Sequence, residues 1–244
     1  MLAFKGTDTD VLSFPSPAMA SQPFVMLPGT KTGLDAERYI EMVNPLPAGP
    51  DAEIPALFLK SKLVGLHAKG KNGLSTTEAL LVDGTGKVYY RFISGAMMVG
   101  ASGFKDSGVS HPRPVVVPKR APDKVVEQAT SPHQTQLYRL SGDYNPLHVD
   151  PDFATGMGFQ EPILHGLCSL GFATRAVLGA FADNDAANFK ALSLRFASPV
   201  LPGQTLVTSM WKEGSRVIFT TAVKETGKVC LSNSYMELAA SSKL

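Results

Sequence analysis

The sequence predicts an α+β protein made of two strand-rich halves, of which only the second has a long buried helix. Three features support this prediction: an apolar run over 163–181, a series of short strands after it, and a proline-dense segment between the halves. A helix that is apolar on every side is usually buried. A buried helix followed by consecutive strands is typical of an antiparallel α+β domain.

The first half is expected to cover residues 1–108. Prolines and glycines interrupt its first 35 or so residues, which predicts irregular chain, and a short helix is predicted over 34–41. Asp83-Gly84-Thr85-Gly86 has the composition of a hairpin turn. Strands are predicted over 54–64, 74–82 and 87–98.

An extended linker is predicted over 109–124, because four prolines fall within it. The second half is expected to cover 125–241, with the apolar helix near its start and a polar turn over 182–188. Strands are predicted over 189–196, 205–212, 216–224 and 229–238.

The composition excludes several classes of protein. The chain has 244 residues, 44% of them hydrophobic, and its net charge of +2 is too small to indicate a nucleic-acid partner. The apolar run approaches membrane-span length, but Pro162, His165 and Arg175 interrupt it, so no membrane span is expected. Cys168 and Cys230 are too few for a disulfide framework and indicate a reducing compartment.

The two ends of the chain bear on its location. The first residues lack the charged segment and apolar run of a signal peptide. The last three, Ser242-Lys243-Leu244, match the tripeptide that directs proteins into peroxisomes. The sequence therefore predicts a peroxisomal protein that binds the import receptor through this tripeptide.

The most informative stretch is Tyr-Arg-Leu-Ser-Gly-Asp-Tyr-Asn-Pro-Leu-His over 138–148. Gly142 and Asn145-Pro146 are turn formers, so Asp143 and His148 are expected on a tight loop. A carboxylate and an imidazole that converge on one water molecule can take a proton and return it near neutral pH. The alternative is that Asp143 only caps a turn and His148 is an ordinary surface histidine.

The start of the apolar helix offers a second chemical feature. A helix N-terminus has free backbone N–H groups and a partial positive charge, which suit a developing oxyanion. Gly166 is the expected donor, because without a side chain it lets a ligand approach the backbone.

The ordered motif, followed by His-Gly at the head of a long apolar helix, resembles the signature of the enoyl-CoA hydratase 2 (MaoC-like) hotdog family. The resemblance implies two hotdog domains, each an antiparallel sheet wrapped around a central helix. The N-terminal domain would be degenerate or shortened and would accommodate the acyl chain. This chain also has fewer residues before the 34–47 segment than such proteins usually have, so the first strands of that domain are expected to be missing.

The activity that the resemblance implies is reversible syn hydration of a trans-2-enoyl-CoA to a (3R)-hydroxyacyl-CoA. Asp143 and His148 would be the catalytic pair, and the Gly166 N–H would hold the thioester oxygen. Coenzyme A would be part of the substrate, with no other cofactor. No metal is expected, because the spacing of Asp143, His148 and Asp150 is not a strong metal motif.

Other residues have two interpretations each. Asn145 either positions the water or only shapes the turn. Tyr144 is a candidate for lining the pocket. Lys119 and Arg120 either contact coenzyme A phosphates or form a solvated surface. His165 is expected to be a hydrogen-bonded residue near the helix start rather than a ligand.

Three other functions remain open: an acyl-CoA thioesterase on the same fold, a non-catalytic acyl-CoA-binding module, and a dehydratase for carrier-protein substrates. The ordered motif argues against the first, and the peroxisomal terminus against the last. The expected partners are the enoyl-CoA or hydroxyacyl-CoA substrate and the import receptor, with a homodimer as a candidate assembly.

Overall fold

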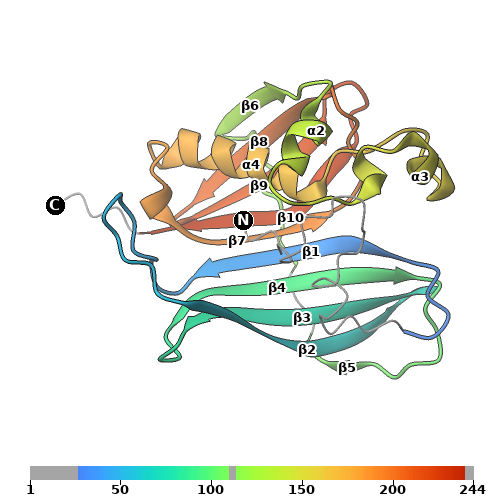
Figure 1. Ribbon diagram of the computed structural model, residues 1–244. Coiled ribbons are helices and arrows are strands. Elements are labelled where there is room, and N and C mark those ends of the chain that lie inside the picture. Colours follow the sequence, from blue (N-terminus) through green and yellow to red (C-terminus); the bar gives the residue numbers. More distant parts are fainter. Residues whose placement is uncertain (1–26, 110–113, 240–244) are drawn as a thin grey trace.

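The computed structural model describes residues 27–109 and 114–239 (Figure 1). They form one continuous antiparallel sheet of ten strands, in the order β5-β2-β3-β4-β1-β7-β10-β9-β8-β6. The first five strands come from the N-terminal half and the last five from the C-terminal half, so the halves join edge to edge at β1 and β7. Among the described residues, no helix is long and apolar enough to cross a membrane.

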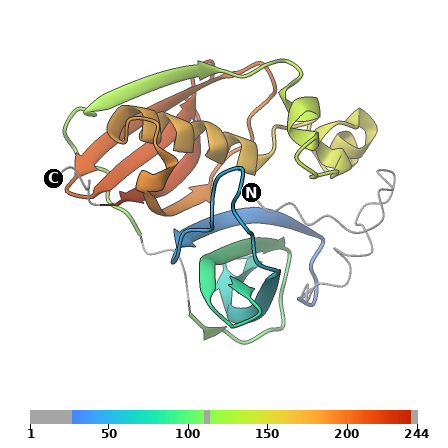
Figure 2. The same ribbon diagram turned by 60° about the vertical axis from the view of Figure 1, so that its left-hand side comes forward.

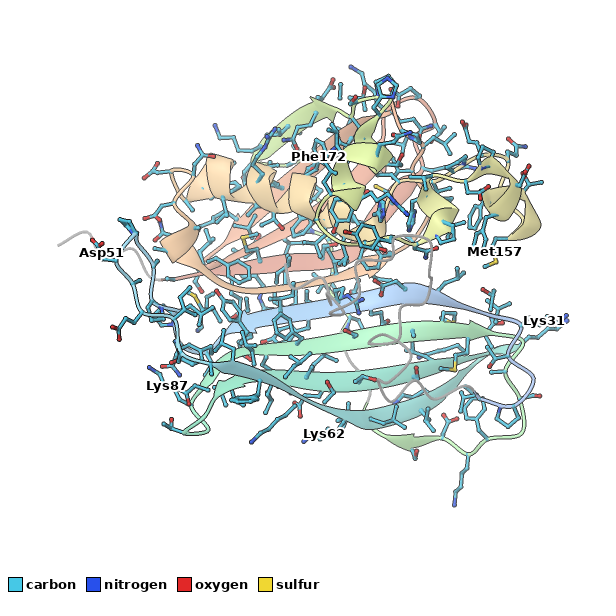
Figure 3. All side chains as sticks on the ribbon, viewed as in Figure 1. Lys31, Asp51, Lys62, Lys87, Met157 and Phe172 are labelled. Carbon is cyan, nitrogen blue, oxygen red and sulfur yellow. The ribbon has the colours of Figure 1, made fainter. Side chains whose placement is uncertain are left out.

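In the N-terminal half β2, β3 and β4 are neighbours in chain order, β1 lies beside β4, and no helix lies within residues 27–109. The predicted hairpin turn is confirmed, because the Asp83 side chain accepts hydrogen bonds from the backbone N–H groups of Thr85 and Lys87 at 2.8 and 3.1 Å. Lys62 and Lys87, labelled in Figure 3, lie on the side of the molecule away from the helix layer. The strands are β1 (Thr32–Met42), β2 (Leu57–Lys69), β3 (Asn72–Asp83), β4 (Val88–Val99) and β5 (Ser107–Gly108).

The predicted helix over 34–41 is wrong, since these residues belong to β1. The segment contains good helix formers, but β1 pairs with β4 on one side and with β7 on the other. Glu37, for example, lies opposite Gly95 on β4 and Arg195 on β7. A strand with two partners satisfies its backbone groups on both edges, and this tertiary context overrides local propensity.

The C-terminal half wraps five strands around the long helix α4 (Gly166–Phe181). Figure 2 shows α4 enclosed between β6 and the strands from β7 to β10. The strands are β6 (Lys124–Ala129), β7 (Phe189–Phe196), β8 (Thr205–Glu213), β9 (Arg216–Val223) and β10 (Val229–Leu238). Short helical turns are α2 (Gln134–Arg139), η1 (Pro146–His148), α3 (Pro151–Gly156) and η2 (Ala186–Asn188).

The main hydrophobic core lies between α4 and this curved sheet. Ala173 and Val177 of α4 are fully buried against strand side chains that include Leu194, Phe219 and Met236. Alternate residues of β9 and β10 face this core, as expected for strands with one buried face. A second, smaller cluster in the N-terminal half contains Leu27, Met98 and Ala101.

The described part of the predicted linker, residues 109 and 114–124, has neither helix nor strand except at Lys124, which begins β6. It is held to the C-terminal sheet, because the indole Nε1 of Trp211 on β8 donates to the backbone oxygen of Arg120 at 2.9 Å. The sheet itself is continuous across the two halves, so the domain limits drawn from the sequence remain a prediction. The terminal tripeptide Ser242-Lys243-Leu244 lies outside the described residues.

Candidate active site

Three side chains from separate segments meet below the start of α4: Asp143, His148 and His165. Asp143 lies on the loop between α2 and η1, His148 ends η1, and His165 immediately precedes α4. The local sequence builds this loop, because Gly142 takes a positive φ of 103° that favours glycine. The Asn145 side chain then accepts a hydrogen bond from the N–H of Leu147 at 3.0 Å and caps η1.

The imidazole of His148 is buried and held in one orientation. Its side chain is 8% exposed, and Nδ1 lies 2.8 Å from the backbone oxygen of Ile163. A carbonyl oxygen can only accept, so Nδ1 carries the proton and the neutral ring has its lone pair on Nε2. Burial lowers the pKa of His148, although the Ile163 carbonyl and the charge of Asp143 oppose this. The ring is therefore neutral at pH 7 and can accept a proton at Nε2.

The carboxyl group of Asp143 has one oxygen engaged and one facing the histidines. Oδ1 accepts a hydrogen bond from the Asn145 N–H at 3.2 Å. Oδ2 lies 4.0 Å from Nε2 of His165. The loop thus fixes the carboxyl group through its own backbone and leaves Oδ2 beside the buried imidazoles.

His165 departs from what the sequence predicts, because neither of its ring nitrogens has a hydrogen-bond partner among the described residues. The residue is 2% exposed. Its ring stacks on His148 at a centroid distance of 3.7 Å and packs against Tyr138 at 4.5 Å. Ring contacts and a contact with the Asp143 backbone hold this residue, rather than a hydrogen bond of normal geometry.

The same three side chains offer ligand atoms that all lie within 4.8 Å of one another, which raises the question of a metal ion. Two features argue against it. The imidazole planes of His148 and His165 are only 28° apart, so their in-plane lone pairs run side by side rather than converging on one point. A metal would need both nitrogens aimed at it from about 2 Å. Nδ1 of His148 is already occupied by the Ile163 oxygen. The cluster suits proton transfer better than metal binding.

Gly166 is the first residue of α4, as the sequence predicts for an oxyanion donor. Its N–H has no acceptor within the helix, since the first turn lacks preceding carbonyls. A Cβ at this position would lie 3.0 Å from ring carbons of Phe196. The aromatic ring on β7 therefore already requires a glycine here, apart from any ligand.

The Tyr144 ring packs on Arg139, and Arg120 of the linker forms ion pairs of its own. The Tyr144 ring faces the Arg139 guanidinium at 5.1 Å, and the backbone oxygen of Tyr144 accepts a hydrogen bond from Arg139 Nη1 at 2.7 Å. Arg120 forms ion pairs with Asp123 and Glu213 at 2.5 and 3.0 Å, and Lys119 is exposed. Lys119 and Arg120 come before β6 in the chain, and the residues of the site come after it. A six-residue strand, which spans about 20 Å, therefore lies between them. The structure does not bring Lys119 or Arg120 to the cluster.

Sequence reasoning missed a contribution from the N-terminal half. Burial raises the pKa of Asp35 on β1, the Arg38 guanidinium opposes this shift, and the charge of Asp143 adds to it. Arg38 Nη2 lies 2.8 Å from Asp35 Oδ2, and both charges also act on Tyr138. This ion pair of β1 therefore borders the loop of Asp143. No local sequence signal shows it, because β1 lies near this loop only after it pairs with β7.

Comparison with known proteins agrees with this architecture. Residues 114–233 match the family model for the MaoC like domain. The chain is 46% identical over 211 residues to peroxisomal multifunctional enzyme type 2 of Mus musculus, covering 86% of this chain but only 28% of that protein. It is 42% identical over 219 residues to the peroxisomal enoyl-CoA hydratase 2 of Arabidopsis thaliana, covering 84% of this chain and 69% of that protein.

A solved structure gives the same result for the fold. The MaoC-like dehydratase from Phytophthora capsici superimposes with a TM-score of 0.83 at 41% identity, covering 98% of this chain and 80% of that one. Fold and motif together define a protein of two hotdog domains, of which the C-terminal one has the Asp–His loop. The chain belongs to the MaoC-like enoyl-CoA hydratase 2 family.

Proposed function

We propose that this protein hydrates trans-2-enoyl-CoA thioesters to (3R)-3-hydroxyacyl-CoA, reversibly and with syn addition. The observation that carries the proposal is the pairing of a neutral, oriented His148 with the carboxyl group of Asp143 below the N-terminus of α4. An unpaired backbone N–H, a proton acceptor and a carboxylate are the groups that this addition needs.

The Gly166 N–H stabilises the enolate-like transition state. It donates to the thioester oxygen while negative charge develops there. The partial positive charge of the helix N-terminus adds to this effect. A donor fixed by the helix needs no reorganisation when the charge appears, so the stabilisation is larger in the transition state than in the bound substrate.

His148 is the base in this mechanism. Its Nε2 removes a proton from water as the oxygen attacks C3, which leaves an imidazolium beside the Asp143 carboxylate. The same pair of residues then returns one proton to C2, so the net change is addition of one water across the double bond. The side-chain oxygen of Asn145 accepts from the turn, and its amide nitrogen is the donor available to orient the water.

The substrate and location follow from the family. Relatives are named as enoyl-CoA hydratase 2 and as peroxisomal proteins. This chain would act on acyl-CoA in peroxisomal fatty acid β-oxidation and be imported through Ser242-Lys243-Leu244. Coenzyme A is part of the substrate and no further cofactor takes part. The N-terminal half, which has no helix within residues 27–109, would accommodate the acyl chain.

The test is turnover of medium- and long-chain trans-2-enoyl-CoA with chiral analysis of the product. Asp143→Asn and His148→Gln should each lower kcat by roughly 10²- to 10⁴-fold with an unchanged fold. Asp150→Asn is the matched control, because that carboxylate caps α3 through the N–H groups of Asp152 and Phe153 instead of facing the imidazoles. Near-normal turnover in both dyad variants would overturn the assignment.

Two alternatives give different products in the same assay. Release of free coenzyme A would identify a thioesterase. Binding of acyl-CoA without any product would identify a non-catalytic module.

A further inference from the structure

His165 is the least explained polar residue in the described part of the chain. It occupies the N-cap position of α4, where a side chain commonly accepts a hydrogen bond from the first turn, yet its side chain makes no such bond. The side chain instead points inward and is almost completely buried, with both ring nitrogens unpaired among the described residues. Leaving a buried polar group unpaired is unfavourable, so such a group calls for an explanation.

The ring of His165 contacts residues of the candidate active site. One face of the ring lies on His148 at 3.7 Å, and Tyr138 packs against it at 4.5 Å. Nε2 points toward Asp143 Oδ2, 4.0 Å away. This gap is about 1 Å longer than a hydrogen bond. Hydrogen bonds in unliganded active sites are often long and tighten only when substrate binds.

We propose that His165 is the positioning residue of the dyad, which supports His148 through its ring face and closes a hydrogen bond from Nε2 to Asp143 during the reaction. This inference rests on the hydratase function proposed above. It assigns to the residue a role in orienting both reacting groups at once.

The electrostatics of the site fit this role. Burial and the neighbouring His148 lower the pKa of His165 to about 3, with a further small effect of Arg139, and the backbone of Asp143 opposes the shift. His165 is therefore a neutral donor at working pH. A neutral ring can donate to the Asp143 carboxylate and can lie against His148 when that ring becomes an imidazolium. A charged His165 would repel the imidazolium and hinder proton transfer.

Two substitutions separate the two contacts. His165→Phe keeps an aromatic ring against His148 but removes the donor to Asp143, and His165→Gln keeps a donor but removes the ring. We expect His165→Phe to lower kcat by about 10- to 100-fold with KM within about 2-fold, because a hydrogen bond to a charged group is lost in the transition state. His165→Gln should recover part of this loss.

A double-mutant cycle tests whether the residue acts through Asp143. In an Asp143→Ala background, which leaves no side-chain acceptor for Nε2, His165→Phe should lower kcat by less than about 2-fold, since the shared interaction is already gone. Thr174→Val is the matched control: its Oγ1 is another buried, unpaired polar atom, located on α4 itself, and the change should leave kcat unaltered. Wild-type kcat in His165→Phe, or the same fold-loss in both backgrounds, would overturn the proposal.

An NMR titration of the ¹⁵N-labelled histidine rings provides a readout that does not depend on turnover, with His148 assigned through His148→Gln. We expect His165 not to titrate between pH 5 and 8, and the His148 titration to move by about half a pH unit or more in His165→Phe. An unmoved His148 titration would contradict the positioning role. If the wild-type protein turned over no enoyl-CoA but the His148 titration moved, the hydratase function would fail while the positioning role stood.

Discussion

Replacing His165 should flatten the dependence of stability on pH. The pKa of this imidazole falls from an ordinary value near 6.5 to about 3 in the folded protein, because the ring is buried and lies beside His148. Below pH 6.5 the unfolded chain binds a proton here that the folded protein does not bind. Stability is therefore complete above pH 6.5 and is lost as the pH falls, until the folded ring also protonates near pH 3.

The size of the effect follows from the pH range over which only the unfolded chain binds this proton. One pH unit corresponds to about 1.4 kcal/mol for one proton. Between pH 6.5 and pH 5 the window covers about 1.5 units, so His165 alone should lower the free energy of unfolding by about 2 kcal/mol. This is a large fraction of the total stability of a typical domain.

The assay is urea denaturation at pH 7.5, 6, 5.5 and 5 for the wild type and His165→Phe, with the free energy of unfolding taken by linear extrapolation. The wild type should lose about 2 kcal/mol more than His165→Phe between pH 7.5 and 5. Thr174→Val is the control, because it alters a buried polar side chain of α4 without removing a titratable group. If the free energy of unfolding fell equally with pH in the wild type and in His165→Phe, the account of a buried neutral ring would be refuted.

Three further predictions concern the rest of the site and the core. The kcat/KM of the wild type should be constant above pH 7 and fall only below pH 6.5, because the pKa of His148 is lowered and the neutral ring is the base; an acid limb centred above pH 7 would contradict this. Gly166→Ala should destabilise the protein by about 1–3 kcal/mol, since its Cβ would meet the Phe196 ring at 3.0 Å, and adding Phe196→Leu should restore stability as measured by urea denaturation. Cys168 and Cys230 are buried and burial raises the pKa of each thiol to about 11, so a thiol reagent at neutral pH should label them only on unfolding; rapid labelling of the native protein would be inconsistent with this.

Much of the C-terminal half could be predicted from local pattern. The ends of β7 and β10 match the predicted strands, because alternating side chains bounded by turn residues are a local signal. The start of α4 was harder: the apolar run begins at Ile163, but the helix begins at Gly166. Ile163 and Leu164 form long-range hydrogen bonds instead. The Ile163 oxygen accepts from His148 Nδ1, and the Leu164 N–H donates to the backbone oxygen of Val200 at 2.7 Å.

The N-terminal half and the third site residue depend on contacts that no local pattern shows. β1 is a strand because β4 and β7 lie on its two sides, and only the assembled sheet places Asp35 near Asp143. The motif gave the loop of Asp143 and His148. It did not show that His165 stacks on His148, because that contact depends on how α4 enters the fold.

The central claim is that the Asp143–His148 pair adds water to an enoyl thioester. Its most direct test is reaction of a trans-2-enoyl-CoA in D₂O with the purified protein, followed by stereochemical analysis of the product. We expect a (3R)-hydroxyacyl-CoA that has one deuterium at C2, added on the same face as the hydroxyl group, and formation of this product at least about 10²-fold slower with Asp143→Asn. A (3S) product, free coenzyme A, or unchanged formation of product by Asp143→Asn would contradict the account.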